Sequence, residues 1–202
     1  MEYKGDKGCD YKSHPPLDHS KSLNDFNDMR IPVFAPYISE KPMKIGSGDF
    51  RIQAFDLTTL DGRWTHTNAD GTPCPIYGFL IAHPEMGRML YITDTELIKW
   101  KFKGINHILL GTNYDKDLVN VDNQSKANHV FRGHLSIDTA CDFVKANYSD
   151  SLQNVIMCHL SSENADKGLF IEKMKSAVPN ANVDIAEPGK EWLLRNPNEC
   201  PF

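Results

Sequence analysis

Histidines and acidic residues are the side chains of this sequence that could do chemistry. Of its eight histidines, five fall where a predicted strand ends or a loop begins, and two aspartates share such positions. Neutral imidazole and carboxylate are ligands that Zn²⁺, Mn²⁺ and iron accept. His14, Asp18 and His19, just before a predicted helix, could converge on such a cation, and Asp94 and His159 each follow a predicted buried strand. His66 lies in the long central loop.

Each of these positions also has a structural interpretation. Asp18 could cap the helix predicted after it, with His14 and His19 solvated. Asp94 follows an apolar run and could cap a helix over 96–101. Taken one at a time, such residues fit a structural role as well as they fit a metal site.

A repeated tripeptide draws attention to His134. His-Leu-Ser occurs at 134–136 and again at 159–161, each time before a predicted helix. The repeat could reflect only a serine cap after a strand end. In a functional interpretation, His134 binds a substrate phosphate or donates a proton to a leaving group. Asn113 and Tyr114 could line the same mouth, whereas His107, inside an apolar run, is predicted to be structural.

Basic and aromatic residues alternate in the segment Lys-Trp-Lys-Phe-Lys at 99–103. Aromatic stacking combined with positive charge is how single-stranded nucleic acid is held. The alternative is an edge segment with Trp100 and Phe102 packed inward and its lysines in solvent.

The elements that position these residues follow from apolar patterns. Strands are predicted at 31–35, 51–57, 76–82, 89–93, 106–111, 154–158, 182–186 and 192–194. Helices are predicted at 19–29, at 137–147 after a Ser136 cap, and in the stretch that ends near 178. Strands in the middle and alternating helices and strands later predict an α/β fold with sheets covered by helices. One domain is expected over 1–202, with irregular tails at 1–12 and 196–202.

Composition narrows the class of protein. The formal net charge of −5 excludes a generic nucleic-acid binder that relies on positive charge alone. Five widely spaced cysteines without a CxxC motif argue against a disulfide scaffold or zinc ribbon and favour a reducing, cytoplasmic location. No apolar stretch is long enough to span a bilayer, so no membrane association is expected.

The order of the motifs resembles a known family. A degenerate HxHxDH motif at 14–19 is followed by a loop histidine, a strand–Asp pair and a strand–His pair. Further matches are FDL (55–57), GFLI (78–81), HPEMG (83–87), LYITDT (90–95), NYD (113–115), GHLS (133–136) and CHLS (158–161). The series is similar to the small cytosolic metallo-β-lactamase-fold hydrolases of Gram-positive bacteria and their phages, over roughly residues 9–195. The resemblance implies a four-layer αββα sandwich.

The resemblance also implies a function and a ligand set. Some members of that group are exonucleases or other phosphodiesterases, so it implies a hydrolase that cuts phosphodiester bonds of nucleic acid or nucleotides with a metal-bound hydroxide. One metal site would use His14 and His66. The second would use Asp18, His19 and His159, with Asp94 bridging the two. Asp18 and His134 would act in catalysis, His134 by assisting the leaving group.

Two departures from the family pattern modify these expectations. Pro16 stands where the family has its second histidine, so one metal site lacks a ligand, and one Zn²⁺ or Mn²⁺ ion with weak activity is expected rather than two ions. The chain also starts only a dozen residues before the motif, so the first strands of the sandwich are expected to be missing. An unpaired sheet edge would then favour a homodimer. The alternative function is a decayed or truncated member that binds nucleotide or protein without cutting.

Overall fold

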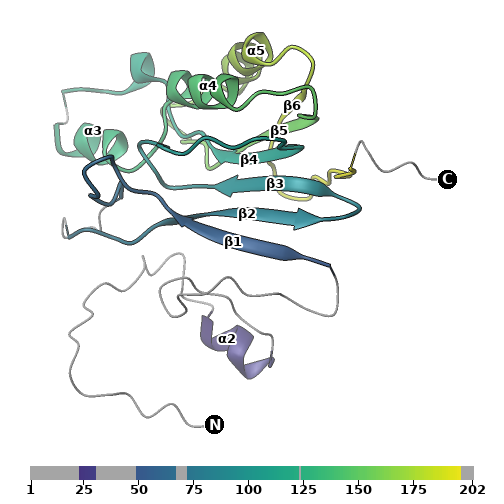
Figure 1. The fold of residues 1–202 in the computed structure, drawn as a ribbon. Helices are drawn as coiled ribbons and strands as arrows, with labels where there is room; N and C mark the ends of the chain where they lie inside the picture. The colour runs from purple at the N-terminus through teal and green to yellow at the C-terminus, as the bar shows by residue number, and fades with distance from the viewer. Residues whose placement is uncertain (1–22, 31–48, 67–71, 123, 197–202) are drawn as a thin grey trace, which may run out of the picture.

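A six-stranded mixed sheet forms the centre of the computed structural model, which describes residues 23–30, 49–66, 72–122 and 124–196 (Figure 1). The strands lie in chain order across the sheet. They are β1 (Arg51–Asp56), β2 (Tyr77–His83), β3 (Gly87–Ile92), β4 (His107–Gly111), β5 (Asn154–Cys158) and β6 (Asn182–Ile185). β1, β2 and β3 are antiparallel neighbours, whereas β3 to β6 run parallel.

The β2–β3 hairpin turns at a glycine that no other residue could replace without strain. Gly87 has a φ of 81°, which L-residues rarely adopt. A Cβ there would also meet the side chain of Asn106, whose Oδ1 accepts a hydrogen bond from the Arg88 amide at 2.8 Å. This packing fixes the start of β3 against the segment that enters β4.

Alternating apolar residues of the central strands build the core on one face of the sheet. Successive strands contribute one pair each, in matching register. The pairs are Leu90 and Ile92, Ile108 and Leu110, Val155 and Met157, and Val183 and Ile185, all of them buried. Period-two alternation is expected where each strand turns one face to the core. Burying this row is the main stabilising term for the sheet.

Helices α4 (Ile137–Ala146) and α5 (Lys167–Ala177) cover this face beside β4, β5 and β6 (Figure 1). Both begin at capping side chains: Ser136 accepts a hydrogen bond from the Thr139 amide, and Asp166 accepts one from the Leu169 amide. Such caps satisfy amides that have no partner within the helix. α4 and α5 pack their buried residues into the core cluster of the sheet.

Three smaller elements complete the described structure. They are α2 (Leu23–Asp28), the 3₁₀ turn η1 (Lys116–Leu118) and α3 (Gln124–Phe131). Ala127 and Val130 of α3 form a second, small core cluster with Tyr114 and Val119. This cluster lies at the end of the sheet where β4 leads into the loop before η1.

Most of the predicted elements are confirmed. The strands at 51–57, 76–82, 89–93, 106–111, 154–158 and 182–186 match β1 to β6, and the helices after Ser136 and before Val178 match α4 and α5. The short helix expected within 19–29 is α2. The strand expected at 31–35 and the tail at 1–12 lie outside the described residues, as do 197–202 of the second tail.

Two of the sequence interpretations differ from the structure. Residues 192–194 are not a strand. Side-chain and turn contacts hold this segment instead, because the Trp192 indole Nε1 donates to Asp184 Oδ2 at 2.9 Å and the Asn196 amide donates to Glu85 O at 2.6 Å. Helix α3 was not predicted, because its few apolar residues give only a weak helical stripe.

The structure confirms the mixed α/β class. A four-layer sandwich requires a second sheet, and the described residues contain one sheet only. Among those same residues, no helix combines the length and apolar character needed to cross a membrane.

Candidate metal centre

Three potential metal ligands meet at the end of the sheet where the parallel strands have their carboxyl ends. Asp94 and His159 follow the parallel strands β3 and β5, so both lie beyond the carboxyl ends of strands, the usual position of ligand sites in open α/β sheets. His134 comes from the loop between α3 and α4. One side-chain atom from each of these residues can be chosen so that all three lie within 4.8 Å of one another. A group of two imidazoles and one carboxylate could hold one metal ion.

The separations within this group suit a shared cation better than direct hydrogen bonds. Asp94 Oδ1 lies 3.6 Å from His134 Nδ1 and 3.4 Å from His159 Nε2. These distances exceed the 2.7–3.2 Å range of good N–H···O hydrogen bonds. Two ligands each about 2.1 Å from a tetrahedral ion are about 3.4 Å apart. The donor set therefore fits an ion by both chemistry and spacing.

Burial differs across the group in a way that leaves one side open. The side chains of Asp94 and His134 are 2% and 12% exposed, whereas that of His159 is 42% exposed. The carboxylate is thus shielded from water, and the site opens to solvent beside the His159 ring. An open side is what a catalytic metal site needs for water or substrate.

Backbone strain accompanies two of the three residues. Asp94 and His159 have φ angles of 53° and 58°, in the left-handed region that costs non-glycine residues free energy. Such strain persists where surrounding structure enforces it, and it clusters at functional sites. Here it turns both side chains back across the strand ends, towards each other.

Asn113 holds His159 in this conformation. Its side-chain Nδ2 donates to the main-chain oxygen of His159 at 2.7 Å and lies 3.3 Å from ring Nδ1. A cation bound at Nε2 leaves the ring proton on Nδ1. In that state the contact between Nδ2 and Nδ1 has to lengthen, whereas the bond to the main-chain oxygen can remain.

Gly111 and Thr95 fix the other side of the group. Gly111 lies at the end of β4, and a Cβ there would meet the Thr93 backbone at 3.0 Å. The absence of a side chain lets the chain entering Asp94 pack against β4. Thr95 Oγ1 lies 2.7 Å from Thr65 Oγ1, which ties this segment to the loop that carries His66.

His66 lies at the margin of the group rather than within it. Its ring centroid is 5.8 Å from that of His134, and its Nδ1 lies 3.4 Å from the Gly133 oxygen. The residue is buried. The structure therefore brings the predicted loop histidine to the site, but His66 does not belong to the close three-residue group.

The predicted ligands divide into three sets. Asp94 and His159 lie in the group, as the sequence indicated, and His66 lies beside it. His14, Asp18 and His19 lie outside the described residues. The alternative in which Asp94 caps a helix over 96–101 is wrong, because those residues form no helix.

His134 has a different place from the one the sequence suggested. It was expected to contact substrate phosphate or the leaving group, and the structure places it among the potential ligands. The serine-cap interpretation of the repeated tripeptide is confirmed for Ser136, which caps α4. It is wrong for Ser161, because α5 begins after an Asp166 cap, and Ser161 Oγ instead accepts from the amides of Glu163 and Asn164 in a turn. The serine of each repeat stabilises a turn, and the histidine of each repeat faces Asp94.

Charged groups near the site favour an anionic ligand. Burial raises the pKa of Glu96, two residues after Asp94, and the positive charges of Arg63 and Arg132 oppose that rise. Both guanidinium groups are therefore near enough to act on Glu96. These two arginines therefore bring positive charge to the segment that follows Asp94.

Cys158 is not a nucleophile. Burial, with a smaller effect of the Asp94 charge, raises the pKa of its thiol to about 12. The thiolate is the reactive form of cysteine, so this side chain stays protonated at neutral pH. The result agrees with the position of Cys158 at the end of a buried strand.

His107 is structural, as predicted. Its Nε2 lies 2.9 Å from the Met86 oxygen and its Nδ1 lies 2.8 Å from the Asn154 side-chain nitrogen. Burial lowers the pKa of this ring. His107 therefore joins β4 to the hairpin and to β5, at the end of the sheet opposite Asp94.

Neither a scan of protein-family models nor a search of curated proteins finds a match for this chain.

Proposed function

We propose that this protein is a metal-dependent hydrolase of phosphodiester bonds in nucleic acid or nucleotides. The observation that carries the proposal is the group of Asp94, His134 and His159, with ligand atoms within 4.8 Å of one another. The group lies at the carboxyl ends of the parallel strands of the mixed sheet, it opens to solvent on one side, and two of its residues adopt strained backbone conformations. The motif order along the sequence supports the same proposal.

One Zn²⁺ or Mn²⁺ ion would be held by these three side chains. Such an ion lowers the pKa of a bound water towards neutrality and polarises a phosphoryl oxygen. Asp94 supplies the negative charge, and its burial strengthens the attraction for a cation. His134 acts as a ligand in this proposal, because its Nδ1 faces Asp94 Oδ1 and a nitrogen engaged with a cation cannot also deliver a proton.

Orientation of the substrate falls to the residues around the group. Arg63 and Arg132 both act electrostatically on Glu96, and guanidinium groups bind phosphate oxygens through paired N–H donors. Arg132 is only two residues from His134 in the sequence. We assign to Arg132 the role of holding a non-bridging phosphate oxygen beside the three potential metal ligands.

The finer fold proposed for the chain is the metallo-β-lactamase-like αββα sandwich. Its support is the second face of the sheet, opposite α4 and α5. Register places Ile52, Ile81 and Met89 in one row of this face and Tyr91 beside Leu109 in the next. All five are half-buried apolar or aromatic residues. A face of this kind suits a further layer, which residues of this chain or of a homodimer partner would supply.

Metal content is the experiment that tests the metal site. We expect about one ion per chain, by elemental mass spectrometry, after loading with Zn²⁺ or Mn²⁺ and dialysis. Asp94→Ala, His134→Asn and His159→Ala should each lose the ion. His83→Asn is the matched control. His83 is the last residue of β2, at the end of the sheet opposite the metal centre, so this variant should load metal normally. Full-length protein that retains no ion would contradict the proposal and leave the non-catalytic binding module.

Activity is tested with bis(p-nitrophenyl) phosphate, and p-nitrophenyl phosphate serves as the monoester control. We expect metal-dependent release of nitrophenol from the diester, lost in His159→Ala and unchanged in His83→Asn. Arg132→Gln should raise KM with a smaller change in kcat, since it removes a phosphate contact rather than an ion ligand. A loaded protein that cleaves neither compound nor a single-stranded oligonucleotide would overturn the hydrolase proposal.

A further inference from the structure

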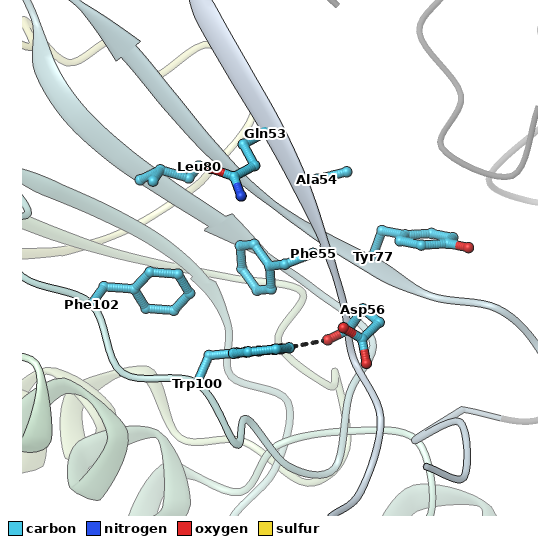
Figure 2. A pocket seen from close by; sticks show the side chains of 8 residues that line it. All are labelled: Gln53, Ala54, Phe55, Asp56, Tyr77, Leu80, Trp100 and Phe102. Atoms are coloured by element: carbon cyan, nitrogen blue, oxygen red, sulfur yellow. Dashed lines mark hydrogen bonds between the residues drawn. The ribbon is translucent and has the colours of Figure 1, made fainter. Parts of the chain in front are cut away.

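A pocket lies at the edge of the sheet along β1, apart from the metal centre. Its volume is about 530 Å³, within the range of small-molecule sites. β1 and β2 contribute Gln53, Phe55, Asp56 and Tyr77, and the segment after Asp94 contributes Trp100 and Phe102 (Figure 2). The β1 residues of the pocket are thus more than forty residues from Trp100 and Phe102 in the sequence.

Three aromatic rings surround one end of this pocket. Phe55 lies 4.9 Å from Phe102 and 6.5 Å from Trp100 by ring centroids, with the Phe55 and Trp100 planes 73° apart. Figure 2 shows the rings of Phe55, Trp100 and Phe102 gathered on one side of β1, with the Gln53 amide above them. The edge-to-face contact of Phe55 and Trp100 is a favourable aromatic packing geometry, and it fixes the orientation of the Trp100 ring beside the pocket.

Trp100 is anchored yet open to solvent. Its Nε1 donates to the main-chain oxygen of Asp56 at 2.7 Å, and its residue surface is 38% exposed. A large aromatic ring that is fixed in orientation but not covered loses little conformational entropy on binding a ligand. The anchoring bond also occupies a backbone acceptor on the outer edge of β1.

The segment that carries the aromatic residues is basic. Lys99 Nζ binds Asp56 Oδ2 at 2.9 Å and lies 4.8 Å from the centre of the Trp100 ring. Lys101 and Lys103 are exposed. Two exposed cations next to Trp100 and Phe102 in the sequence, in a chain of net charge −5, complement a ligand that joins a planar ring to a phosphate.

The pocket reaches the same end of the strands as the metal centre. β1 and β3 are both antiparallel to β2, so Asp56, the last residue of β1, and Asp94, which follows β3, lie at the same end of the sheet. Two strand spacings separate β1 from β3, which is roughly 10 Å. A nucleotide chain with one phosphate at the metal centre could place a neighbouring base in this pocket.

We propose that the β1 pocket binds a nucleobase of the phosphodiester substrate, a role that rests on the proposed hydrolase function. The base stacks against Trp100 and Phe102, Gln53 contacts its polar edge, and Lys101 and Lys103 attract the adjoining phosphate. Each of the two interpretations of residues 99–103, a nucleic-acid-binding segment and an edge segment with aromatic residues packed inward, then describes part of the segment. Phe102 packs partly against the core, and the exposed ring of Trp100 is left for the ligand.

The three tryptophans of the chain make a direct test possible by ¹H–¹⁵N NMR. Trp64, Trp100 and Trp192 give three indole N–H signals, which single Trp→Phe variants assign. Adenosine 5′-monophosphate is titrated into metal-free full-length protein, with ribose 5-phosphate and benzyl alcohol as controls. We expect AMP to shift the Trp100 signal in a saturable way, while the Trp192 signal serves as the reporter of an intact fold.

Variants sharpen the result. Trp100→Leu should weaken AMP binding about tenfold. Because this variant lacks the Trp100 indole, its binding is measured from the backbone amide signal of Phe102. Gln53→Ala, at an exposed edge position, should weaken it less and gives a second variant if Trp100→Leu does not fold. Lys175→Ala, on α5 far along the sheet, is the matched control and should bind like the parent chain. Equal affinity for AMP and ribose 5-phosphate, or for AMP and benzyl alcohol, would overturn the assignment to a nucleobase.

The Asp94→Ala variant separates this proposal from the catalytic one. It should lose the metal ion yet bind AMP with unchanged affinity at Trp100. Diester cleavage without any AMP-dependent shift at Trp100 would overturn the pocket and leave the hydrolase in place. An AMP-dependent shift at Trp100 in a protein that binds no metal would support the pocket and overturn the hydrolase.

Discussion

The side-chain nitrogen of Asn113 donates a 2.7 Å hydrogen bond to the main-chain oxygen of His159, across the ends of β4 and β5. This bond constrains His159, whose φ is 58°. In this conformation His159 Nε2 lies 3.4 Å from Asp94 Oδ1. Metal ligands depend on such neighbours for their orientation, and loss of the neighbour typically costs ten- to a hundredfold in metal affinity. Asn113 is therefore a positioning residue of the metal centre.

Asn113→Ala should weaken Zn²⁺ binding by about ten- to a hundredfold, since His159 would no longer be held in its strained conformation. Isothermal titration measures the affinity directly. His159→Ala and the Asn113→Ala/His159→Ala double variant test the route of the effect. If Asn113 acts through His159, the double variant should bind Zn²⁺ no more weakly than His159→Ala. Additive losses would show that Asn113 acts by another route.

Backbone strain at His159 predicts an unusual order of stability among its variants. His159→Gly should be more stable than His159→Ala by about 1 kcal/mol, because glycine adopts a positive φ without the Cβ penalty. The ring is 42% exposed, so both variants lose similar packing. Urea unfolding gives the two free energies. At exposed Lys145 inside α4, the order should reverse, with alanine more stable than glycine by about 1 kcal/mol. The same order at both positions would contradict the strain.

Much of the sheet could be predicted because its strands are short apolar runs between turns. Val155, Ile156 and Met157 read as a buried strand from composition alone, and Asp94 and His159 stood out because each follows such a run. Strand order and direction could not be read in this way. They decide that β3 and β5 lie on either side of β4 with their carboxyl ends together, which brings Asp94 to His159.

The rest of the site depends on local conformation that residue types do not encode. The left-handed backbone of Asp94 and His159 is one such feature. His134 is another, because its approach to Asp94 depends on the loop before α4, where the Asn113 amide donates to Leu135 O at 2.9 Å and the Ile137 amide donates to Tyr114 O at 2.9 Å. The repeated His-Leu-Ser and the GHLS match at 133–136 pointed to His134, but neither indicated that the two histidines face the same carboxylate.

Gly111 predicts that the metal centre is sensitive to a single methyl group. Gly111→Ala would place a Cβ 3.0 Å from the Thr93 backbone, which has to move because backbone atoms cannot rotate away. We expect a loss of about 1–3 kcal/mol in the free energy of unfolding. Zn²⁺ affinity should fall as well, because Thr93 precedes Asp94. Urea unfolding and zinc titration check both effects. A variant with unchanged affinity would show that Asp94 is positioned independently of β4.

A buried carboxylate away from the site predicts how stability depends on pH. Asp115 has a side chain only 2% exposed, and Lys173 Nζ of α5 lies 3.0 Å from its Oδ2. Burial alone would raise the pKa of Asp115, but the Asp117 amide and the Lys173 ammonium outweigh that effect and lower it. The folded state therefore prefers the ionised carboxyl. This preference contributes stability above the ordinary aspartate pKa near 3.9, and the contribution is lost as pH falls through the lower folded value.

Lys173→Met should destabilise the protein by about 2 kcal/mol at pH 7, because it leaves the buried Asp115 carboxylate without its cation while keeping the methylene packing. The difference from the parent chain should shrink as pH falls through the acidic range, because Asp115 without Lys173 takes up a proton at a higher pH than it does in the parent chain. Urea unfolding between pH 3 and pH 7 measures this. Lys175→Met, two residues along α5 and exposed, should change stability by no more than about 0.5 kcal/mol. A pH-independent difference for Lys173→Met would mean that lost packing, rather than the charge of Asp115, destabilises the variant.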